Sequence, residues 1–403
     1  MTGALRPPAL PTAPPYGSAS LAELMPAVAA SLGVPSTDRP DPGWGLPPAR
    51  RTVVVLVDGL GEVCLRARTG HAPTLRRLLA DTAADASGAP DVLAVGFPTT
   101  TATSLASIGT GLPPGRHGMV GTEVLDPDRD VLFSELSWDP AVDPRRWQPH
   151  PTVFETLRAA GVDVAHVAPA LFDGSGLTTA ALRGPRFAAA GTLDQRVELT
   201  GHLLRAADRC LVFLYWEGLD KTGHVHGWQS GQWTDELERV DAAVGRLLEL
   251  VPADVAVFVT GDHGMVDVEP GHRVDLRAVP GLLDGVAHLG GEPRARYAYA
   301  RPGAAADVLT AFVDVVGEQC SVMTGDEAVA AGWFGPVVDA EVARRLPAVL
   351  AVPHAPVALV DPARQRPESL ALLGLHGALT DTESRVPLLR GFGQAAPGRR
   401  RVR

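Results

Sequence analysis

Four short runs of mainly apolar residues recur along the chain. They occupy residues 52–57, 162–167, 211–216 and 255–260, and the second is the most polar. Polar and apolar positions do not alternate within them, which is typical of strands covered on both faces. The pattern therefore predicts a parallel β-sheet buried between two layers.

Segments with helical spacing separate these runs. Thr152 and Glu155 form a capping box that predicts a helix reaching about residue 160. Residues 21–32 and 237–250 also carry apolar positions at helical spacing. Alternating strands and helices predict an α/β fold: a doubly wound, mostly parallel sheet with helices on both faces.

Residues 270–350 interrupt that alternation. One strand is predicted at 294–300 and one helix at 304–316, and the remainder is less regular. We expect a smaller, cap-like α+β insertion here, between two parts of the α/β core at 18–269 and 351–395. The apolar pattern predicts that the core resumes near 357–360 and closes with 370–376.

The two ends of the chain differ from the core in composition. Residues 1–17 are rich in proline and are predicted to form a disordered leader, and residues 396–403 form a basic tail. Neither a signal peptide nor a run of eighteen apolar residues is present. The expectation is a protein with no membrane partner, located in the cytoplasm.

Composition narrows the classes of partner. The 403 residues carry a formal net charge of -10, which disfavours nucleic acid as a partner. The three cysteines are odd in number and far apart, so they indicate neither a disulfide framework nor a cysteine-based zinc site. A reducing compartment fits this cysteine usage.

Acidic residues follow two of the apolar runs directly. Asp58 ends the first run, and Asp262 and His263 follow the last one between two glycines. In open α/β sheets, ligands bind beyond the carboxyl ends of the strands. Carboxylate and imidazole together suit zinc, although an isolated aspartate at a strand end is more often only a turn former.

A second candidate pair follows the third run. Asp220 and His224 are four residues apart, so on a helical turn both side chains lie on one face and can bind one ion. His376 is a further candidate between glycines near the end of the core. Each signal is weak alone, because a lone histidine near a loop is more often structural or exposed.

A hydroxyl-rich segment precedes a predicted helix that begins near Thr101 and ends at the glycines 109 and 111. The free amides of a helix N-terminus favour a bound phosphate oxygen. Thr101 is thus a candidate nucleophile. The alternative is that these hydroxyls only cap the helix.

In combination, these motifs resemble the alkaline phosphatase superfamily, and specifically its type I phosphodiesterase/nucleotide pyrophosphatase family. The resemblance covers roughly residues 50–270 and 355–390. The matching segments are, in order, Val-Asp-Gly at 57–59, Phe-Pro-Thr-Thr-Thr at 97–101, Thr-Gly-Leu-Pro-Pro-Gly-Arg-His-Gly at 110–118, Asp-Lys-Thr-Gly-His at 220–224, Gly-Asp-His-Gly-Met at 261–265 and Leu-His-Gly at 375–377.

The resemblance implies two divalent metal ions, most readily Zn²⁺. By motif position, the first ion would be held by Asp220, His224 and His376. The second would be held by Asp58, Asp262, His263 and Thr101, with Thr101 also the nucleophile. His117 and His226 match no ligand position and are expected to be structural or exposed.

Two positions depart from the family pattern. Nucleotide-cleaving relatives carry an asparagine three residues after the nucleophile, where this chain has Ser104. A hydroxyl can donate one hydrogen bond to a phosphate oxygen. The aromatic residue that usually follows the nucleophile is replaced by Ala102, which weakens the expectation of base stacking there.

The function that the resemblance implies is a two-metal phosphodiesterase or nucleotide pyrophosphatase that acts through a covalent phosphothreonine on a small-molecule phosphoester. A phosphomonoesterase or phosphonoacetate hydrolase of the same superfamily is the alternative, and a non-catalytic scaffold stabilised by metals is a third possibility. Selectivity is expected from the insertion and from the loop 122–138. The sequence gives no oligomeric state.

Overall fold

The computed structural model describes residues 11–85 and 87–395. Its central sheet has six strands in the order β18-β8-β1-β7-β5-β6, all parallel except β18. Each of the four apolar runs forms one of these strands, which confirms the predicted sheet. The strands are β1 (Arg51–Val57), β5 (Asp163–Ala168), β6 (Arg186–Ala189), β7 (Cys210–Trp216), β8 (Val255–Thr260) and β18 (Leu389–Phe392).

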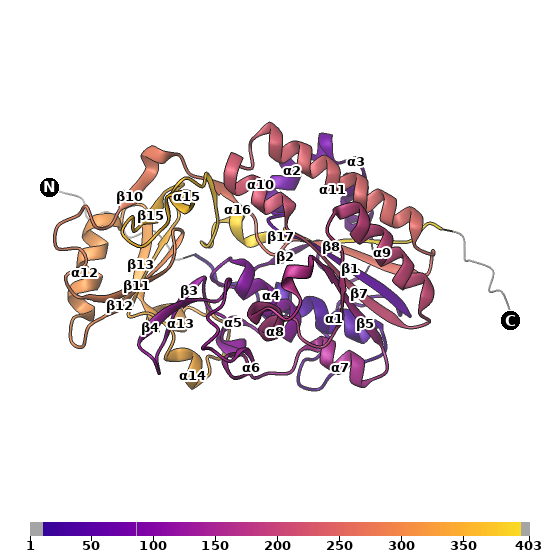
Figure 1. Ribbon diagram of the computed structural model, residues 1–403, viewed down its shortest axis with the longest axis horizontal. Helices are drawn as coiled ribbons and strands as arrows, with labels where there is room; N and C mark the ends of the chain where they lie inside the picture. Colours follow the sequence, from indigo (N-terminus) through magenta and orange to yellow (C-terminus); the bar gives the residue numbers. More distant parts are fainter. Residues whose placement is uncertain (1–10, 86, 396–403) are drawn as a thin grey trace.

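Helices cover both faces of this sheet (Figure 1). Successive side chains of a strand point to opposite faces, so Val53 and Val55 pack in one buried cluster and Val54 and Leu56 in another. The doubly wound architecture is thereby confirmed. Side chains of α3 (Pro73–Ala83), α9 (Leu193–Ala206) and α11 (Gly231–Leu250) join the first cluster, and those of α1 (Leu24–Ser31), α4 (Thr101–Thr110) and α7 (Val153–Ala159) join the second.

Helix α11 begins six residues before the helix that the sequence predicts at 237–250. The Ser230 side chain caps it by accepting a hydrogen bond from the Trp233 amide. Trp233 itself is fully buried and anchors the added turns. The apolar spacing alone did not register this extension, because the first turns carry mostly polar residues.

Residues 286–353 fold around a four-stranded antiparallel sheet in the order β11-β12-β14-β13. We call this sheet and its helix α12 the cap; in Figure 1 it lies apart from the central sheet, beside the hairpin β3–β4. That hairpin belongs to the loop 122–138. The cap comprises β11 (Val286–Glu292), β12 (Ala295–Ala300), α12 (Ala305–Val316), β13 (Cys320–Thr324) and β14 (Val349–Pro353), and the hairpin comprises β3 (Glu123–Asp126) and β4 (Val131–Ser134).

The segments 357–360 and 370–376, where the sequence predicts that the core resumes and closes, do not join the central sheet. Strand β15 (Ala358–Val360) pairs with β10 (Arg273–Asp275), and β16 (Gly374–Leu375) pairs with β9 (Val266–Asp267), both outside the central sheet. The last strand of the central sheet is β18, which lies antiparallel at its edge. Its short segment includes an arginine and a glycine, so it lacks the continuous apolar run of a covered strand.

Short elements complete the described chain. They are η1 (Leu21–Glu23), α2 (Glu62–Ala67), η2 (Thr69–His71), β2 (Val92–Ala94), α5 (Pro114–His117), α6 (Pro144–Trp147), η3 (Ala170–Phe172), α8 (Gly176–Ala181), α10 (Gly218–His226), η4 (Pro270–His272), α13 (Gly325–Ala330), α14 (Ala340–Ala343), α15 (Pro367–Leu370), α16 (Asp381–Ser384) and β17 (Arg385–Pro387). None of the helices that the structure describes is both long and apolar enough to cross a membrane.

Part of the predicted leader packs on the body of the protein. The Tyr16 hydroxyl donates to the carbonyl oxygen of Trp333 at 2.8 Å and accepts from the Phe97 amide at 3.3 Å. Residues 1–10 of the leader and the basic tail 396–403 lie outside the described residues.

Candidate metal centre

Two neighbouring strands of the central sheet deliver the first aspartates. Asp58 follows β1, and Asp262 lies two residues beyond the adjacent parallel strand β8. Oδ1 of Asp262 accepts from the Gly59 amide at 3.0 Å, which ties the two strand ends together. Gly59 has φ +76°, and a Cβ there would lie 3.0 Å from Cα of Asp220, so only glycine fits this approach.

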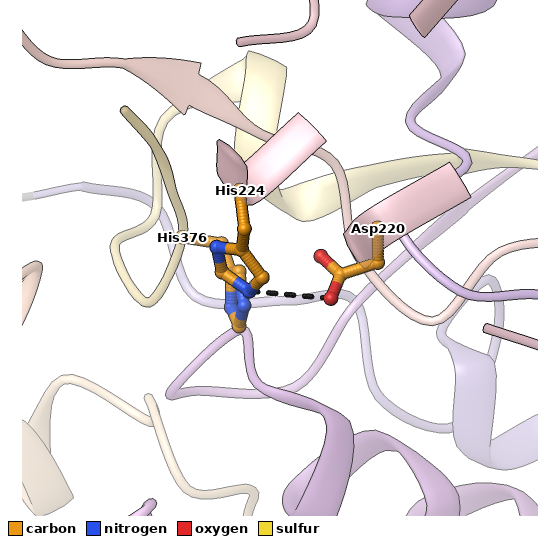
Figure 2. A group of neighbouring side chains, drawn as sticks. All are labelled: Asp220, His224 and His376. Carbon is orange, nitrogen blue, oxygen red and sulfur yellow. Dashed lines mark ion pairs between the residues drawn. The ribbon is translucent and has the colours of Figure 1, made fainter. Parts of the chain in front are cut away.

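Helix α10 follows the third strand of this group, β7, and brings the next ligands. Asp220 and His224 lie on one face of α10, with Oδ2 of the carboxylate 3.2 Å from Nε2 of the imidazole. Figure 2 shows His376, from the loop after β16, converging on the same point. The ring centroids of His224 and His376 are 5.2 Å apart.

The three candidate histidines share one hydrogen-bonding arrangement. In each, Nδ1 contacts a backbone carbonyl oxygen: Gly374 for His224 at 2.7 Å, Gly264 for His263 at 3.0 Å, and Thr99 for His376 at 2.8 Å. A proton held on Nδ1 by a carbonyl leaves the Nε2 lone pair free. Metal-binding histidines typically have this arrangement.

The three candidate aspartates also share a feature. Each is at most 8% exposed and keeps one buried carboxylate oxygen with no hydrogen-bond partner. Buried carboxylate oxygens are rarely left unpaired, because desolvating them is costly. The unpaired oxygens are Oδ1 of Asp58, Oδ1 of Asp220 and Oδ2 of Asp262. Free oxygens and free Nε2 atoms in one buried cluster fit divalent cations.

The ligand atoms form two groups that share Asp220. Asp220, His224 and His376 form the first, and Asp58, Asp220 and His263 form the second, with the atoms of each group within 4.8 Å of one another. The first is the ligand set expected for the first ion. The second contains Asp220 where we expected Asp262, whose free oxygen lies 3.7 Å from Nε2 of His263.

The charges of the cluster also call for cations. Burial, and then the negative charge of Asp58, raise the pKa of Asp262 well above its ordinary value. Burial lowers the pKa of His263, but the carboxylates of Asp262 and Asp58 outweigh it and hold that pKa well above its ordinary value. The metal-free cluster therefore retains protons that a bound cation would displace.

Thr101 is the first residue of α4, as predicted, and its Oγ lies 3.3 Å from Nε2 of His263. The preceding residue, Thr100, occupies the cap position, yet its side chain does not cap the helix. It contacts the Thr122 hydroxyl instead, at 3.0 Å. The hydroxyl of Thr101 thus faces the ligand cluster.

Ser104 lies one turn further along α4. Its hydroxyl donates to the backbone carbonyl oxygen of Asp262 at 2.7 Å, and the side chain is fully buried. In this arrangement its single proton is not free for a phosphate oxygen. The contact holds the loop that carries Asp262 against the helix that carries Thr101.

Comparison with known proteins decides the family. A model of the type I phosphodiesterase/nucleotide pyrophosphatase family matches residues 52–378. The chain belongs to this family. The matched segment begins in β1 and ends just after His376, so it includes all seven predicted ligand positions of this type I phosphodiesterase family member.

Solved structures of similar fold agree with this assignment. Murine ectonucleotide pyrophosphatase/phosphodiesterase 5 is 20% identical, with a TM-score of 0.66 over 85% of this chain and 88% of that one. Phosphonoacetate hydrolase from Sinorhizobium meliloti, in complex with phosphonoformate, is 19% identical, with a TM-score of 0.63 over 88% of this chain and 92% of that one. At these identities the likeness concerns the fold, and it confirms the alkaline phosphatase-like architecture.

Sequence reasoning missed two polar residues beside the centre of this phosphodiesterase family member. Tyr215 donates to Oδ2 of Asp58 from within β7, where the sequence shows only an apolar strand. Glu292 reaches the site from the cap, far along the chain. Neither stands in a motif, so only the packing of the elements shows their place.

His117 lies away from the ligand cluster, as expected. Its Nε2 contacts the Ser107 hydroxyl at 3.0 Å, and its Nδ1 accepts from the Met119 amide at 3.1 Å. Burial lowers its pKa to about 3, so it stays neutral. His226 ends α10 with an exposed side chain, and neither histidine belongs to the two ligand groups found among the described residues.

Proposed function

We propose that this chain is a two-metal phosphodiesterase or nucleotide pyrophosphatase that acts through a phosphothreonine formed on Thr101. One observation carries the proposal: the Thr101 hydroxyl, at a helix N-terminus, lies 3.3 Å from His263 inside a buried cluster of unpaired carboxylate oxygens. Family membership supports the broader class of phosphoester hydrolase.

Seven residues would hold the ions. Asp220, His224 and His376 would bind the first, and Asp58, Asp262, His263 and Thr101 the second, with Asp220 placed between the two groups. When bound, two Zn²⁺ ions supply positive charge that stabilises a phosphate in the transition state and favours deprotonated oxygen nucleophiles. Carboxylate and imidazole ligands suit zinc.

The reaction is then carried by Thr101. Its oxygen gives up its proton to solvent and forms a bond to phosphorus while the bond to the leaving group breaks, and the leaving group departs with the electron pair. In a second displacement a water oxygen bonds to phosphorus, the bond between phosphorus and Oγ breaks, and a proton from that water restores the Thr101 hydroxyl. The free amides at the start of α4 favour a phosphate oxygen by roughly 0.3–1 kcal/mol, so the helix end makes a small contribution beside the metal charge.

Charge balance favours a diester. Before Thr101 ionises, the three carboxylates and three neutral imidazoles of the ligand set with two dications give a local charge of about +1, which matches a phosphodiester at -1. Screening reduces the effect of distant charges over about 8 Å at physiological ionic strength, so the net charge of -10 contributes little at the site.

The decisive experiment compares metal content and hydrolysis in one preparation. We expect the purified protein to bind zinc, to lose activity with a chelator and to regain it with Zn²⁺. Bis(4-nitrophenyl) phosphate should be cleaved faster than 4-nitrophenyl phosphate or phosphonoacetate. A zinc-loaded protein that cleaves no ester would support the scaffold alternative, and preference for the monoester or the phosphonate would support those hydrolases.

We further propose a reducing, cytoplasmic location for the protein. Cys64, Cys210 and Cys320 are all buried and free of disulfides. Burial raises the pKa of each thiol to about 12, so the thiols stay protonated at neutral pH.

A further inference from the structure

One buried carboxylate beside the metal-binding residues has no part in the proposed reaction. Glu292 ends strand β11 of the cap and is 6% exposed. Its Oε2 accepts a hydrogen bond from the Thr122 hydroxyl at 2.9 Å, whereas Oε1 is buried without a hydrogen-bond partner. An unpaired buried acceptor is costly, which points to a function for this residue.

Two neighbours place Glu292 beside residues that adjoin the centre. The Thr122 hydroxyl that binds it also lies 3.0 Å from the hydroxyl of Thr100, the residue before the proposed nucleophile. On its other side, a Cβ added to Gly377, the residue after the proposed ligand His376, would lie 2.9 Å from Cγ and 3.1 Å from Cδ of Glu292. The carboxyl group is thus flanked by neighbours of the nucleophile and of a ligand.

Glu292 forms no ion pair within the described part of the chain. The guanidinium of Arg296, on the adjacent strand β12, donates to the carbonyl oxygen of Leu359 instead. Two residues after Glu292, Arg294 forms a fully buried ion pair with Glu383 of α16 at 2.6 Å, which fixes this cap hairpin to the core. Glu292 is therefore a rigidly placed carboxyl group that has no ion-pair partner among the described residues.

We propose that Glu292 is a specificity-determining residue that makes the site select singly charged phosphodiesters over doubly charged phosphomonoesters. The proposal rests on the phosphodiesterase function proposed above. Bound cations attract a dianion more strongly than a monoanion, and a fixed carboxylate close by opposes that attraction. Removing the charge should then benefit the dianion more than the monoanion.

The test is Glu292→Gln, which keeps the shape and the hydrogen bond from Thr122 but removes the charge. The assay compares kcat/KM for 4-nitrophenyl phosphate and bis(4-nitrophenyl) phosphate in zinc-loaded protein at pH 8.5. Burial, opposed by the hydrogen bond from Thr122, raises the pKa of Glu292 to about 7, so it is ionised at this pH. We expect the ratio of monoester to diester activity to rise about tenfold, equivalent to about 1.4 kcal/mol.

Glu135→Gln is the matched control. Glu135 is also a fully buried carboxylate whose pKa burial raises to about 7, but it binds the indole of Trp147 and the amides of Val120 and Gly121. Losing its charge should leave the monoester-to-diester ratio unchanged. An equal rise in both variants would overturn the inference, because any loss of buried charge would then suffice.

Binding gives a readout that is independent of turnover. Calorimetry measures the affinity of the zinc-loaded protein for phenylphosphonate, a dianion, and for the monomethyl ester of phenylphosphonate, a monoanion. The wild type should bind the dianion no more tightly than the monoanion. Glu292→Gln should bind the dianion about tenfold more tightly than the wild type does. An unchanged activity ratio and unchanged dianion binding in folded, zinc-loaded Glu292→Gln would overturn the inference. If that variant does not fold, the two affinities of the wild type decide. A wild type that binds the dianion tenfold more tightly than the monoanion would overturn the inference.

The outcomes separate this inference from the proposed function. A zinc-loaded wild type that cleaves neither ester refutes the proposed function, while the binding comparison still tests the charge effect of Glu292. If the wild type cleaves the diester and Glu292→Gln has the same ratio of monoester to diester activity, the proposed function stands and the inference about Glu292 is wrong.

Discussion

The phenol hydroxyl of Tyr215 donates a hydrogen bond to Oδ2 of Asp58. This contact decides which carboxylate oxygen remains free: Oδ1, which has no hydrogen-bond partner and lies 3.3 Å from Nε2 of His263. Burial, followed by the charge of Asp58, raises the pKa of Tyr215 well above its ordinary value, so the phenol remains a donor. Tyr215 therefore orients a proposed ligand without binding metal itself.

Replacing Tyr215 with phenylalanine should weaken zinc binding. Loss of a hydrogen bond that orients a ligand typically lowers metal affinity about 10- to 100-fold, and zinc titration against a competing chelator measures it. Tyr297→Phe is the control, because the buried Tyr297 hydroxyl donates only to the carbonyl oxygen of Val120, at 2.8 Å. Equal zinc affinities in Tyr215→Phe and wild type would rule out the orienting role.

Thr101→Ala should abolish turnover of bis(4-nitrophenyl) phosphate while leaving most of the bound zinc in place, since six other ligands remain. Thr103→Ala is a matched control on the same helix, because the Thr103 hydroxyl is buried and has no hydrogen-bond partner. It should keep the activity of the wild type. Residual turnover in Thr101→Ala comparable to that of Thr103→Ala would remove Thr101 from the mechanism.

Ser104→Ala should distinguish two roles for this hydroxyl. Because Ser104 donates to the carbonyl oxygen of Asp262, its removal leaves a buried acceptor unpaired and should cost about 1–3 kcal/mol of stability. We expect a lower melting temperature and lower zinc occupancy in elemental analysis. A variant with normal stability and zinc content but a raised KM would instead place Ser104 on the phosphate, as the family position suggests.

The sequence was sufficient for those site residues whose position follows from the sheet. Asp58 and Asp262 follow unbroken apolar runs, and parallel strands bring such ends to one edge. Thr101 could be placed because the hydroxyl-rich segment stands directly before an apolar helix. These predictions needed only local patterns and a general rule of sheet topology.

The remaining features depend on contacts between distant segments. Glu292 approaches Thr122 across 170 positions, and Tyr215 approaches Asp58 across 157. Nothing in the sequence around either residue marks it as part of the site. The edge strand β18 was likewise hidden, because a half-exposed strand with a glycine and an arginine resembles a loop.

The effect of zinc on stability should grow as pH rises. The folded-state pKa values of Asp262 and His263 are both raised, so in metal-free protein their protons stabilise the fold at low pH, and this stability is lost as pH increases through those pKa values. Zinc replaces the protons and binds more tightly at higher pH. Melting curves between pH 6 and pH 9 should show a widening gap between zinc-loaded and metal-free protein; a constant or narrowing gap would contradict the proposed ligand set.

Glu383→Gln should destabilise the protein strongly, because it breaks the fully buried ion pair that joins the cap to the core. The carboxylate binds Arg294 at 2.6 and 3.0 Å, and removing one partner of such a pair typically costs about 3–5 kcal/mol, since the other charge stays buried and unpaired. Chemical denaturation measures the loss. Glu341→Gln, in an exposed pair with Arg344, should leave the free energy of unfolding nearly unchanged. Unfolding of both variants at the same denaturant concentration would show that this ion pair does not hold strands β11 and β12, and with them Glu292, against the core.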